Sequence, residues 1–392
     1  MIKKDRRQMD KGNLSKIIRL RHELHRHPEL SLSETGTAER IKRFLKDNTA
    51  LAIEERDGWF CAVKKGTDPK SAAVAFRADM DALPIDETGS KLPYASAVPG
   101  VSHKCGHDGH SAALCALALE LDRVPAERTV YLIFQGAEEI GEGAKKAALL
   151  IKEKGIREIY AFHNLSGYPV GKILYRTGLT QPSSEGVTIR FYGRQSHASA
   201  PEDGRNPSLV IARTVLRIQE FLAVPRGKMV LCTVVGMNAG NGDFGISAGE
   251  GSLMLTLRAE EEQDLKKMEK EILSFAGEEA EKEGIRTASS VTDYFPETRN
   301  SEEGLEKVLR AAGRLHLPAE EMASLWRASE DFGYYLKECS GAMFYIGNGE
   351  DWPALHTEGY DFNDRILETA VALFLEIIKE QETVFCRTDR EE

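Results

Sequence analysis

The sequence predicts an α/β protein of two domains, in which a ferredoxin-like α+β domain is inserted into a larger domain with a mixed sheet. Two observations support this. Apolar, β-rich runs alternate with helical stretches in the first part of the chain, and this texture changes near Pro182 and returns after Pro296. The 392 residues are enough for two domains. We expect residues 1–183 and 295–392 to form the larger domain, with residues 184–294 inserted between them.

The first segment alternates helices and buried strands, which predicts a sheet with crossover connections. Residues 14–48 have helical apolar spacing, and the stretch His27–Leu30 divides them into two helices. The expected buried strands are 73–76, 130–134 and 159–162. The expected helices between them are 109–122 and 145–154.

The middle of the chain has the element order β-α-β-β-α-β, which is typical of a ferredoxin-like unit. Its first strand alternates apolar and polar residues, as a half-buried strand does. The expected elements are a strand at 186–193, a helix at 207–223, strands at 229–237 and 252–259, a helix at 260–284 and a strand at 286–293.

Composition and charge exclude several classes of protein. Hydrophobic residues make up 41% of the chain, the net charge is −10, and no basic stripe is present, so we expect no nucleic-acid partner. No apolar run is long enough to span a bilayer, and the basic N-terminus lacks the apolar core of a signal peptide. Six cysteines are scattered without the spacing of a disulfide framework. We therefore expect a cytoplasmic protein without a membrane partner.

The loop Ser102–His110 carries the strongest chemical signal. One glycine separates Cys105 from His107 just before a predicted helix, so a thiolate and an imidazole can converge on one cation. Asp108 could accept a hydrogen bond from the second ring nitrogen of a ligand histidine. A polar loop that caps a helix is the alternative, and this motif does not by itself decide between the two.

Further candidate ligands follow strands. Glu138 and Glu139 come after a buried strand, where one carboxylate can bind a cation while the other stays free as a base; a solvated pair is the alternative. His163 ends the next strand, where open α/β sheets bind ligands, although a lone histidine there is more often structural. His356 follows a later strand and a glycine loop. The candidate metal ligands are Cys105, His107, Glu139, His163 and His356.

Taken together, these segments resemble those of the aminoacylase/carboxypeptidase-type metalloamidohydrolases. The most similar branch contains hippurate hydrolase, auxin-conjugate hydrolase and N-acetyldiaminopimelate deacetylase. Nearly the whole chain takes part in the resemblance. The motifs that carry it are Leu24–Ser31, Phe76–Pro84, Cys105–Asp108, Glu138–Glu139, His163–Asn164, Ser196–Ala198, Ser329–Phe332 and Leu355–His356.

The resemblance implies a metallopeptidase-like catalytic domain with two divalent metal ions. Cys105 would bridge or contact the pair, and the other four candidate ligands would complete the shells. Sulfur and imidazole ligands favour zinc, while manganese, nickel and cobalt remain open. Glu138 would take a proton from water and deliver it to the leaving amine. Asp81 would orient a ligand histidine; the alternative is that Asp79 and Asp81 end a strand and accept hydrogen bonds from loop amides.

By the same resemblance, the inserted domain supplies two substrate-binding residues. His197 would hold the substrate carbonyl and stabilise the oxyanion, often across a dimer interface, which implies a homodimer. The alternative is a histidine at a hairpin tip. Arg258 would meet a substrate carboxylate through two parallel hydrogen bonds, and an interdomain salt bridge is the alternative.

The chain departs from the family pattern at two places. Gly136 stands where proline is usual, which would loosen that turn. The family's Asn-Val-Ile-Pro segment, which supplies an asparagine amide, is replaced by Gly245–Ala248. Asn238 or Asn241 could take the place of that amide. The metal motifs are intact, whereas the substrates of named relatives do not transfer directly.

These observations predict a metal-dependent amidohydrolase that cleaves the amide bond of N-acyl amino acids. Two alternatives remain open: a metallo-carboxypeptidase or dipeptidase that acts on short peptides, and a catalytically silent scaffold of the same fold. The presence of Glu138 beside five candidate ligands favours an enzyme. The sequence leaves open the acyl group, the amino acid and the native metal.

Overall fold

The computed structural model describes residues 9–225 and 227–380. The beginning of the basic N-terminal segment and Cys386 lie outside these residues. Among the helices that are described, none combines the length and the apolar character needed to cross a membrane.

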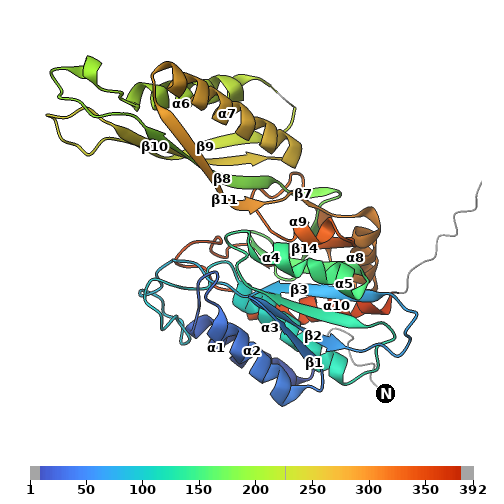
Figure 1. Cartoon of the computed structure of the whole chain (residues 1–392). Coiled ribbons are helices and arrows are strands. Elements are labelled where there is room, and N and C mark those ends of the chain that lie inside the picture. Colours follow the sequence, from blue (N-terminus) through green and yellow to red (C-terminus); the bar gives the residue numbers. More distant parts are fainter. Residues whose placement is uncertain (1–8, 226, 381–392) are drawn as a thin grey trace, which may run out of the picture.

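An eight-stranded mixed sheet forms the centre of the large domain, with the strand order β1-β2-β4-β3-β5-β14-β6-β13 (Figure 1). β3 is parallel to β4 and β5, and β5 is parallel to β14, whereas β2 is antiparallel to β4. Every residue of β3 and β4 is buried, which is typical of strands covered on both faces. The strands are β1 (Ala52–Arg56), β2 (Trp59–Lys64), β3 (Ala73–Asp79), β4 (Val130–Gln135), β5 (Ile156–Ser166), β6 (Ile173–Tyr175), β13 (Ala319–Glu321) and β14 (Ser340–Gly349).

Helices cover both faces of this sheet and bury two separate apolar cores. Figure 1 shows α1 and α2 on the opposite side of the sheet from α4 and α5. The helices of the larger core are α1 (Lys11–Arg26), α2 (Thr35–Asn48), α3 (His107–Asp122), α8 (Glu302–Arg314) and α10 (Leu367–Lys379). Those of the smaller core are α4 (Gly143–Ala147), α5 (Leu149–Lys154) and α9 (Gly333–Leu336).

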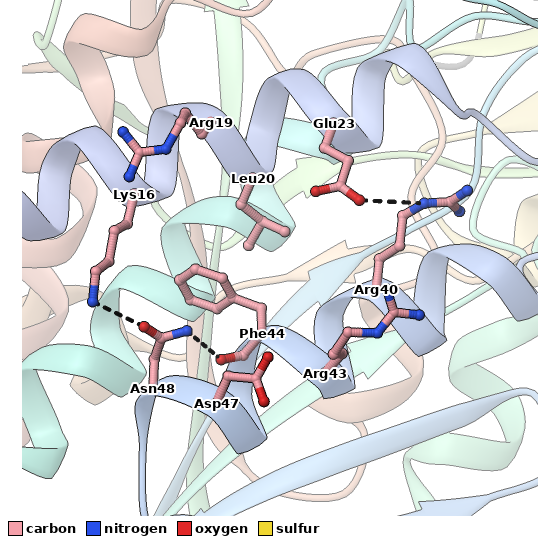
Figure 2. A pocket seen from close by; sticks show the side chains of 9 residues that line it. All are labelled: Lys16, Arg19, Leu20, Glu23, Arg40, Arg43, Phe44, Asp47 and Asn48. Carbon is pink, nitrogen blue, oxygen red and sulfur yellow. Dashed lines mark hydrogen bonds and ion pairs between the residues drawn. The ribbon is translucent and has the colours of Figure 1, made fainter.

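The first two helices are separated at His27–Leu30, as expected from the proline there. Between them, Figure 2 shows Leu20 and Phe44 facing each other, and Lys16 donates a hydrogen bond of 2.9 Å to Asn48. The hollow at this place has a volume of about 390 Å³ and is lined mainly by exposed charged side chains. It is a solvated surface and not the chemical site.

The second segment of the large domain completes the sheet. β14 lies between β5 and β6, and it places Tyr345 opposite His163 in a parallel register. The strand that follows the inserted region therefore lies beside the strand that carries a candidate metal ligand.

The inserted region forms a separate sheet with the strand order β11-β8-β10-β9, in which all pairs are antiparallel. Two helices cover one face of this sheet and bury its core. Figure 1 shows this small domain projecting from the large one. Its elements are β8 (Ser183–Tyr192), α6 (Ser208–Ala223), β9 (Val230–Ala239), β10 (Glu250–Ala259), α7 (Glu262–Lys282) and β11 (Arg286–Phe295).

The two connections between the domains lie side by side. β7 (Leu179–Gln181) precedes the small domain, β12 (Thr298–Arg299) follows it, and the two strands pair antiparallel. The predicted fold class, an α/β domain with an inserted β-α-β-β-α-β unit, is confirmed. The division of the chain at residues 184 and 294 stays a prediction.

Two glycines in helices should respond oppositely to alanine. At Gly109 in α3, an added Cβ would lie 2.2 Å from the Phe362 ring, whereas at Gly277 in α7 no atom lies within 4 Å. We expect Gly109→Ala to destabilise the protein by about 1–3 kcal/mol through overpacking. Gly277→Ala should stabilise it by about 0.5–1 kcal/mol, because alanine favours a helix. Thermal unfolding midpoints test this, and equal shifts for the two variants would contradict the packing of α3.

Candidate metal centre

The candidate residues lie at one edge of the large sheet. β3, β4, β5 and β14 run in one direction, so their carboxyl ends meet there. Glu138 and Glu139 follow β4, His163 lies in β5, and the loop after β14 carries His356. Cys105, in the loop before α3, contacts His163 at this edge.

All five predicted ligands converge here. Cys105 Sγ is 3.3 Å from His163 Nε2 and 3.3 Å from His356 Nε2. Glu139 Oε1 is 3.6 Å from His356 Nε2 and 3.8 Å from His107 Nε2. The donor atoms form two groups, Cys105–His107–His163 and Cys105–Glu139–His356, and within each group they lie within 4.8 Å of one another. Cys105 belongs to both groups.

This spacing fits cations with sulfur, nitrogen and oxygen ligands. Donors bound at about 2.0–2.3 Å to one tetrahedral ion lie roughly 3.3–3.8 Å apart. His107 Nε2 and Glu139 Oε1 are buried without a hydrogen-bond partner, although buried polar atoms are normally paired. Burial and nearby carboxylates raise the pKa of the Cys105 thiol, and a bound cation would favour its thiolate form. The residues therefore fit a pair of cations.

Backbone carbonyls orient two of the histidines. His107 Nδ1 lies 3.0 Å from the carbonyl oxygen of Asp81, and His163 Nδ1 lies 2.7 Å from that of Asn164. A ring nitrogen that donates to a carbonyl leaves the other nitrogen, Nε2, free to bind a cation. Nε2 of His163 faces Cys105 Sγ, and Nε2 of His107 faces Glu139 Oε1.

Asp81 connects a candidate ligand to the Glu138–Glu139 pair. Its Oδ1 is 3.3 Å from His107 Nδ1, and its Oδ2 accepts hydrogen bonds from the Glu139 amide at 2.9 Å and from Ser31 Oγ at 2.7 Å. Burial alone would raise the pKa of Asp81, but the hydrogen bond and charge of His107 lower it overall. Asp81 thus touches a candidate ligand and also accepts from a loop amide, so both expected contacts are present.

The side chain of Asp108 points to α1, not to a candidate ligand. Its Oδ2 is 2.8 Å from His25 Nδ1 and 3.4 Å from Arg21 Nη1. The other nitrogen of His25 is 3.1 Å from Glu87, which also pairs with Lys104. This buried network fixes the loop before α3 against the first helix.

Arg77, which was not among the residues predicted from the sequence, holds together the carboxylates beside Glu138. Arg77 in β3 is buried, and its guanidinium lies 2.7 Å from Asp79, 2.7 Å from Asp331 and 3.1 Å from Glu330. Burial, with the charge of Glu330 and the other carboxylates nearby, raises the pKa of Glu138 well above its usual value. A cation bound beside Glu138 would oppose that shift.

The position between Cys105 and His107 requires glycine for steric reasons. Gly106 has φ 98°, and a Cβ there would lie 2.3 Å from Asn164 Oδ1. Asn164 in turn is 2.7 Å from His110 Nε2, and the other nitrogen of His110 is 2.7 Å from Asp79. A side chain at position 106 would displace this buried chain of hydrogen bonds.

A cavity of about 870 Å³ opens between the domains and reaches Cys105, Glu138, Glu139, His163 and His356. Arg258, at the end of β10, also lines it, and its guanidinium donates a hydrogen bond to the carbonyl of Arg327. Among the described residues, no carboxylate pairs with Arg258, so the expected alternative of an interdomain salt bridge is not formed. Its positive charge faces the cavity unneutralised.

The structure does not bring His197 to this cavity. His197 is exposed in the segment after β8, and its Nδ1 is 2.6 Å from Ser199 Oγ. β8 runs away from the cavity wall, from Gly186 to Tyr192, which places this segment roughly 20 Å away at about 3.3 Å per residue. The β9–β10 hairpin, with Asn238, lies at the same distant end.

Known proteins resemble this chain over almost its whole length. Residues 75–380 match the model of peptidase family M20/M25/M40. The hippurate hydrolase of Campylobacter jejuni is 30% identical over 371 residues, which cover 92% of this chain and 94% of that protein. The N-acetylcysteine deacetylase of Bacillus subtilis is 28% identical over 377 residues, or 94% and 97% of the two chains.

A solved structure supports the same relationship. A dinuclear metal-binding peptidase of the M20 family from Bacillus subtilis superposes with a TM-score of 0.79 and 26% identity. The alignment covers 94% of this chain and 98% of that one.

The buried network at α1 should make stability depend on pH in a defined window. The pKa of His25 is raised to about 9, against burial, by Asp108 and Glu87, so its stabilisation is complete below pH 6.5 and is lost through pH 9. The pKa of Glu87 is lowered to about 2, against burial, by His25 and Lys104, so its stabilisation is complete above pH 4.5 and is lost towards pH 2.

We therefore expect Glu87→Gln to lower the unfolding midpoint by several degrees between pH 4.5 and 6.5, and by less at pH 3 and at pH 9.5. The matched control is Glu142→Gln, which removes an exposed carboxylate. Thermal scans of metal-free protein at the three pH values measure the effect. A difference that stays constant with pH would contradict this ionisation of the network.

Proposed function

Because this chain belongs to peptidase family M20/M25/M40, we propose that it is a metal-dependent amidohydrolase that acts on N-acyl amino acids. Hydrolysis of amide bonds is the chemistry of the family, and the hippurate hydrolase and deacetylase relatives cleave N-acyl amino acids by name. The observation that carries the proposal is the convergence of the five candidate ligands beside Glu138, at the floor of an interdomain cavity.

We propose that two divalent cations bind here. The two donor groups share Cys105, which suits a ligand that contacts both ions, and His107, His163, Glu139 and His356 would complete the shells. Sulfur and imidazole favour zinc, and manganese, nickel and cobalt accept the same donors. When bound, the cations supply Lewis acidity and lower the pKa of water.

In this proposal Glu138 is the general base. Its carboxylate is buried in the cavity beside the ligands, where it can take a proton from the attacking water and pass it to the leaving nitrogen. Asp81 holds the ring of His107 in the orientation that exposes Nε2.

We assign the substrate carboxylate to Arg258, because its guanidinium faces the cavity without an acidic partner. His197 would act in the cavity of a second copy of the chain, since it lies too far from its own. The small domain offers an edge for this contact: β9 is the last strand of its sheet, and Val235 and Met237 are 57% and 62% exposed.

Peptides are the second candidate substrate. The family is one of peptidases, and a cavity of about 870 Å³ is large enough for a dipeptide.

A cytoplasmic location completes the proposal, because the five cysteines of the described residues are all free thiols.

The wild-type protein, with metal bound, should hydrolyse members of a panel of acetyl-, benzoyl- and dipeptidyl-amino acids. Glu138→Gln should retain the metal and lower kcat by about 10²–10⁴-fold, the usual contribution of a general base. Metal analysis and amine release measure both properties.

The control for that experiment is Glu142→Gln, which should keep both metal and activity. Full activity of Glu138→Gln would remove the assignment of the base. A metal-loaded wild-type protein that is inert on the whole panel would support the silent scaffold.

If the β9 edge forms a dimer, Val235→Lys should produce monomers and lower activity together, because His197 then has no second cavity to reach. Val291→Lys on β11, the opposite edge, is the matched control; Val291 is 41% exposed. Light scattering during size-exclusion chromatography measures the mass. A Val235→Lys dimer, or a fully active monomer, would contradict the arrangement.

A further inference from the structure

The turn after β4 holds a backbone conformation that needs support. Ala137 has φ 54°, in the left-handed region that residues with a Cβ rarely adopt. Glu138 and Glu139 follow at once, so the direction of both carboxylates depends on this residue. Such a conformation persists only when the surroundings hold it.

Glu34, from the start of α2, contacts this turn from behind. Its side chain is buried, and Oε1 accepts a hydrogen bond of 2.6 Å from the amide of Ala137. The two residues are 103 positions apart in the sequence. The contact joins the N-terminal helical pair to the segment that carries the general base.

The Glu34 carboxylate does not cap its own helix. Glu34 occupies the N-cap position of α2, yet its side chain makes no capping hydrogen bond. Glu29 serves that end of the helix instead, because its carboxylate accepts from the amides of Gly36 and Thr37 at 3.1 and 2.6 Å. The carboxylate of Glu34 is thereby free for Ala137.

Gly136 makes the approach possible. A Cβ at this position would lie 2.7 Å from Glu34 Oε1 and 2.9 Å from its Cδ. Any side chain there would push the carboxylate away from the turn. The space left by the glycine is filled by the Glu34 carboxylate.

Other contacts restrain the turn at its far side. Asp81 accepts a hydrogen bond from the Glu139 amide, and the Gly141 amide donates a hydrogen bond of 2.8 Å to the Glu138 carbonyl. Behind Gly136 and Ala137 lies a hollow of about 600 Å³ that Glu34 also lines. Without that carboxylate, the Ala137 amide would face the hollow.

We propose that Glu34 is a positioning residue whose carboxylate fixes the Gly136–Ala137 turn and thereby aims Glu138 at the cavity. The catalytic part of this inference rests on the proposed function, whereas the positioning of the turn does not. Glu139 keeps its own hydrogen bond to Asp81, so metal binding should survive the loss of Glu34. The expected loss is one of turnover and not of substrate affinity.

Four variants and one matched control test the proposal. Glu34→Ala should lower kcat roughly 10–100-fold, the scale expected for a slightly misplaced catalytic group, with KM within about twofold and metal content unchanged. Glu34→Gln should recover most of the activity, because its amide oxygen still accepts from Ala137. Gly136→Ala should resemble Glu34→Ala, and the double variant should lose no more than either alone. Glu29→Ala, the matched control, removes the real helix cap and should leave kcat unchanged.

Hydrogen exchange supplies a readout that needs no activity. The segment 136–143 of the metal-loaded protein should exchange at least tenfold faster in Glu34→Ala than in wild type or Glu29→Ala. Unchanged exchange, or a kcat loss shared equally by Glu29→Ala, would overturn the proposal. An inert wild-type protein with faster exchange in Glu34→Ala would remove the proposed function and retain the positioning of the turn.

Discussion

The site depends on one buried guanidinium. Arg77 projects from β3 into a region without solvent and contacts Asp79, Glu330 and Asp331, so its charge is compensated by carboxylates from both segments of the large domain. Oδ2 of Asp331 accepts hydrogen bonds from the Gln135 side chain and from the Ala144 amide. These two residues lie before and after the segment that carries Glu138, so Asp331 joins its two ends. Removing one partner from such a buried network leaves an uncompensated charge, which is strongly unfavourable.

The same cluster of carboxylates gives this edge of the sheet an excess of negative charge that bound cations would offset. Arg77 is outnumbered by the carboxylates of Asp79, Glu138, Glu330 and Asp331, and Glu139 adds a further acid beside them. An excess of buried negative charge is costly unless protons or metal ions offset it. Two divalent ions would offset the excess and pair the orphaned ligand atoms at once, so the electrostatics and the ligand geometry support the same conclusion.

Sequence patterns predict those parts of the site that are local. The Cys105–His107 spacing, the adjacent glutamates and the strand ends gave the ligand set, and the strand alternation gave the order of the elements. Partners distant in sequence leave no such pattern. Arg77 and Asp331 are 254 residues apart, and His25 meets Asp108 across 83 residues. These pairs form because α9, which follows Asp331, and α1, which carries His25, pack against opposite faces of the sheet, and only the tertiary structure reveals this packing.

The position of the small domain adds a last constraint. Its two connections pair as β7 and β12, so the domain is attached at one place. β10 ends near this place and brings Arg258 to the cavity, whereas β8 starts there and leads away from the cavity towards His197. His197 therefore lies near one end of β8, whereas the cavity of the same chain lies at the other end. If His197 takes part in amide hydrolysis, the active unit must contain two chains, and the apolar edge of β9 is the surface that would join them. The length of one strand thus links the catalytic proposal to the oligomeric state.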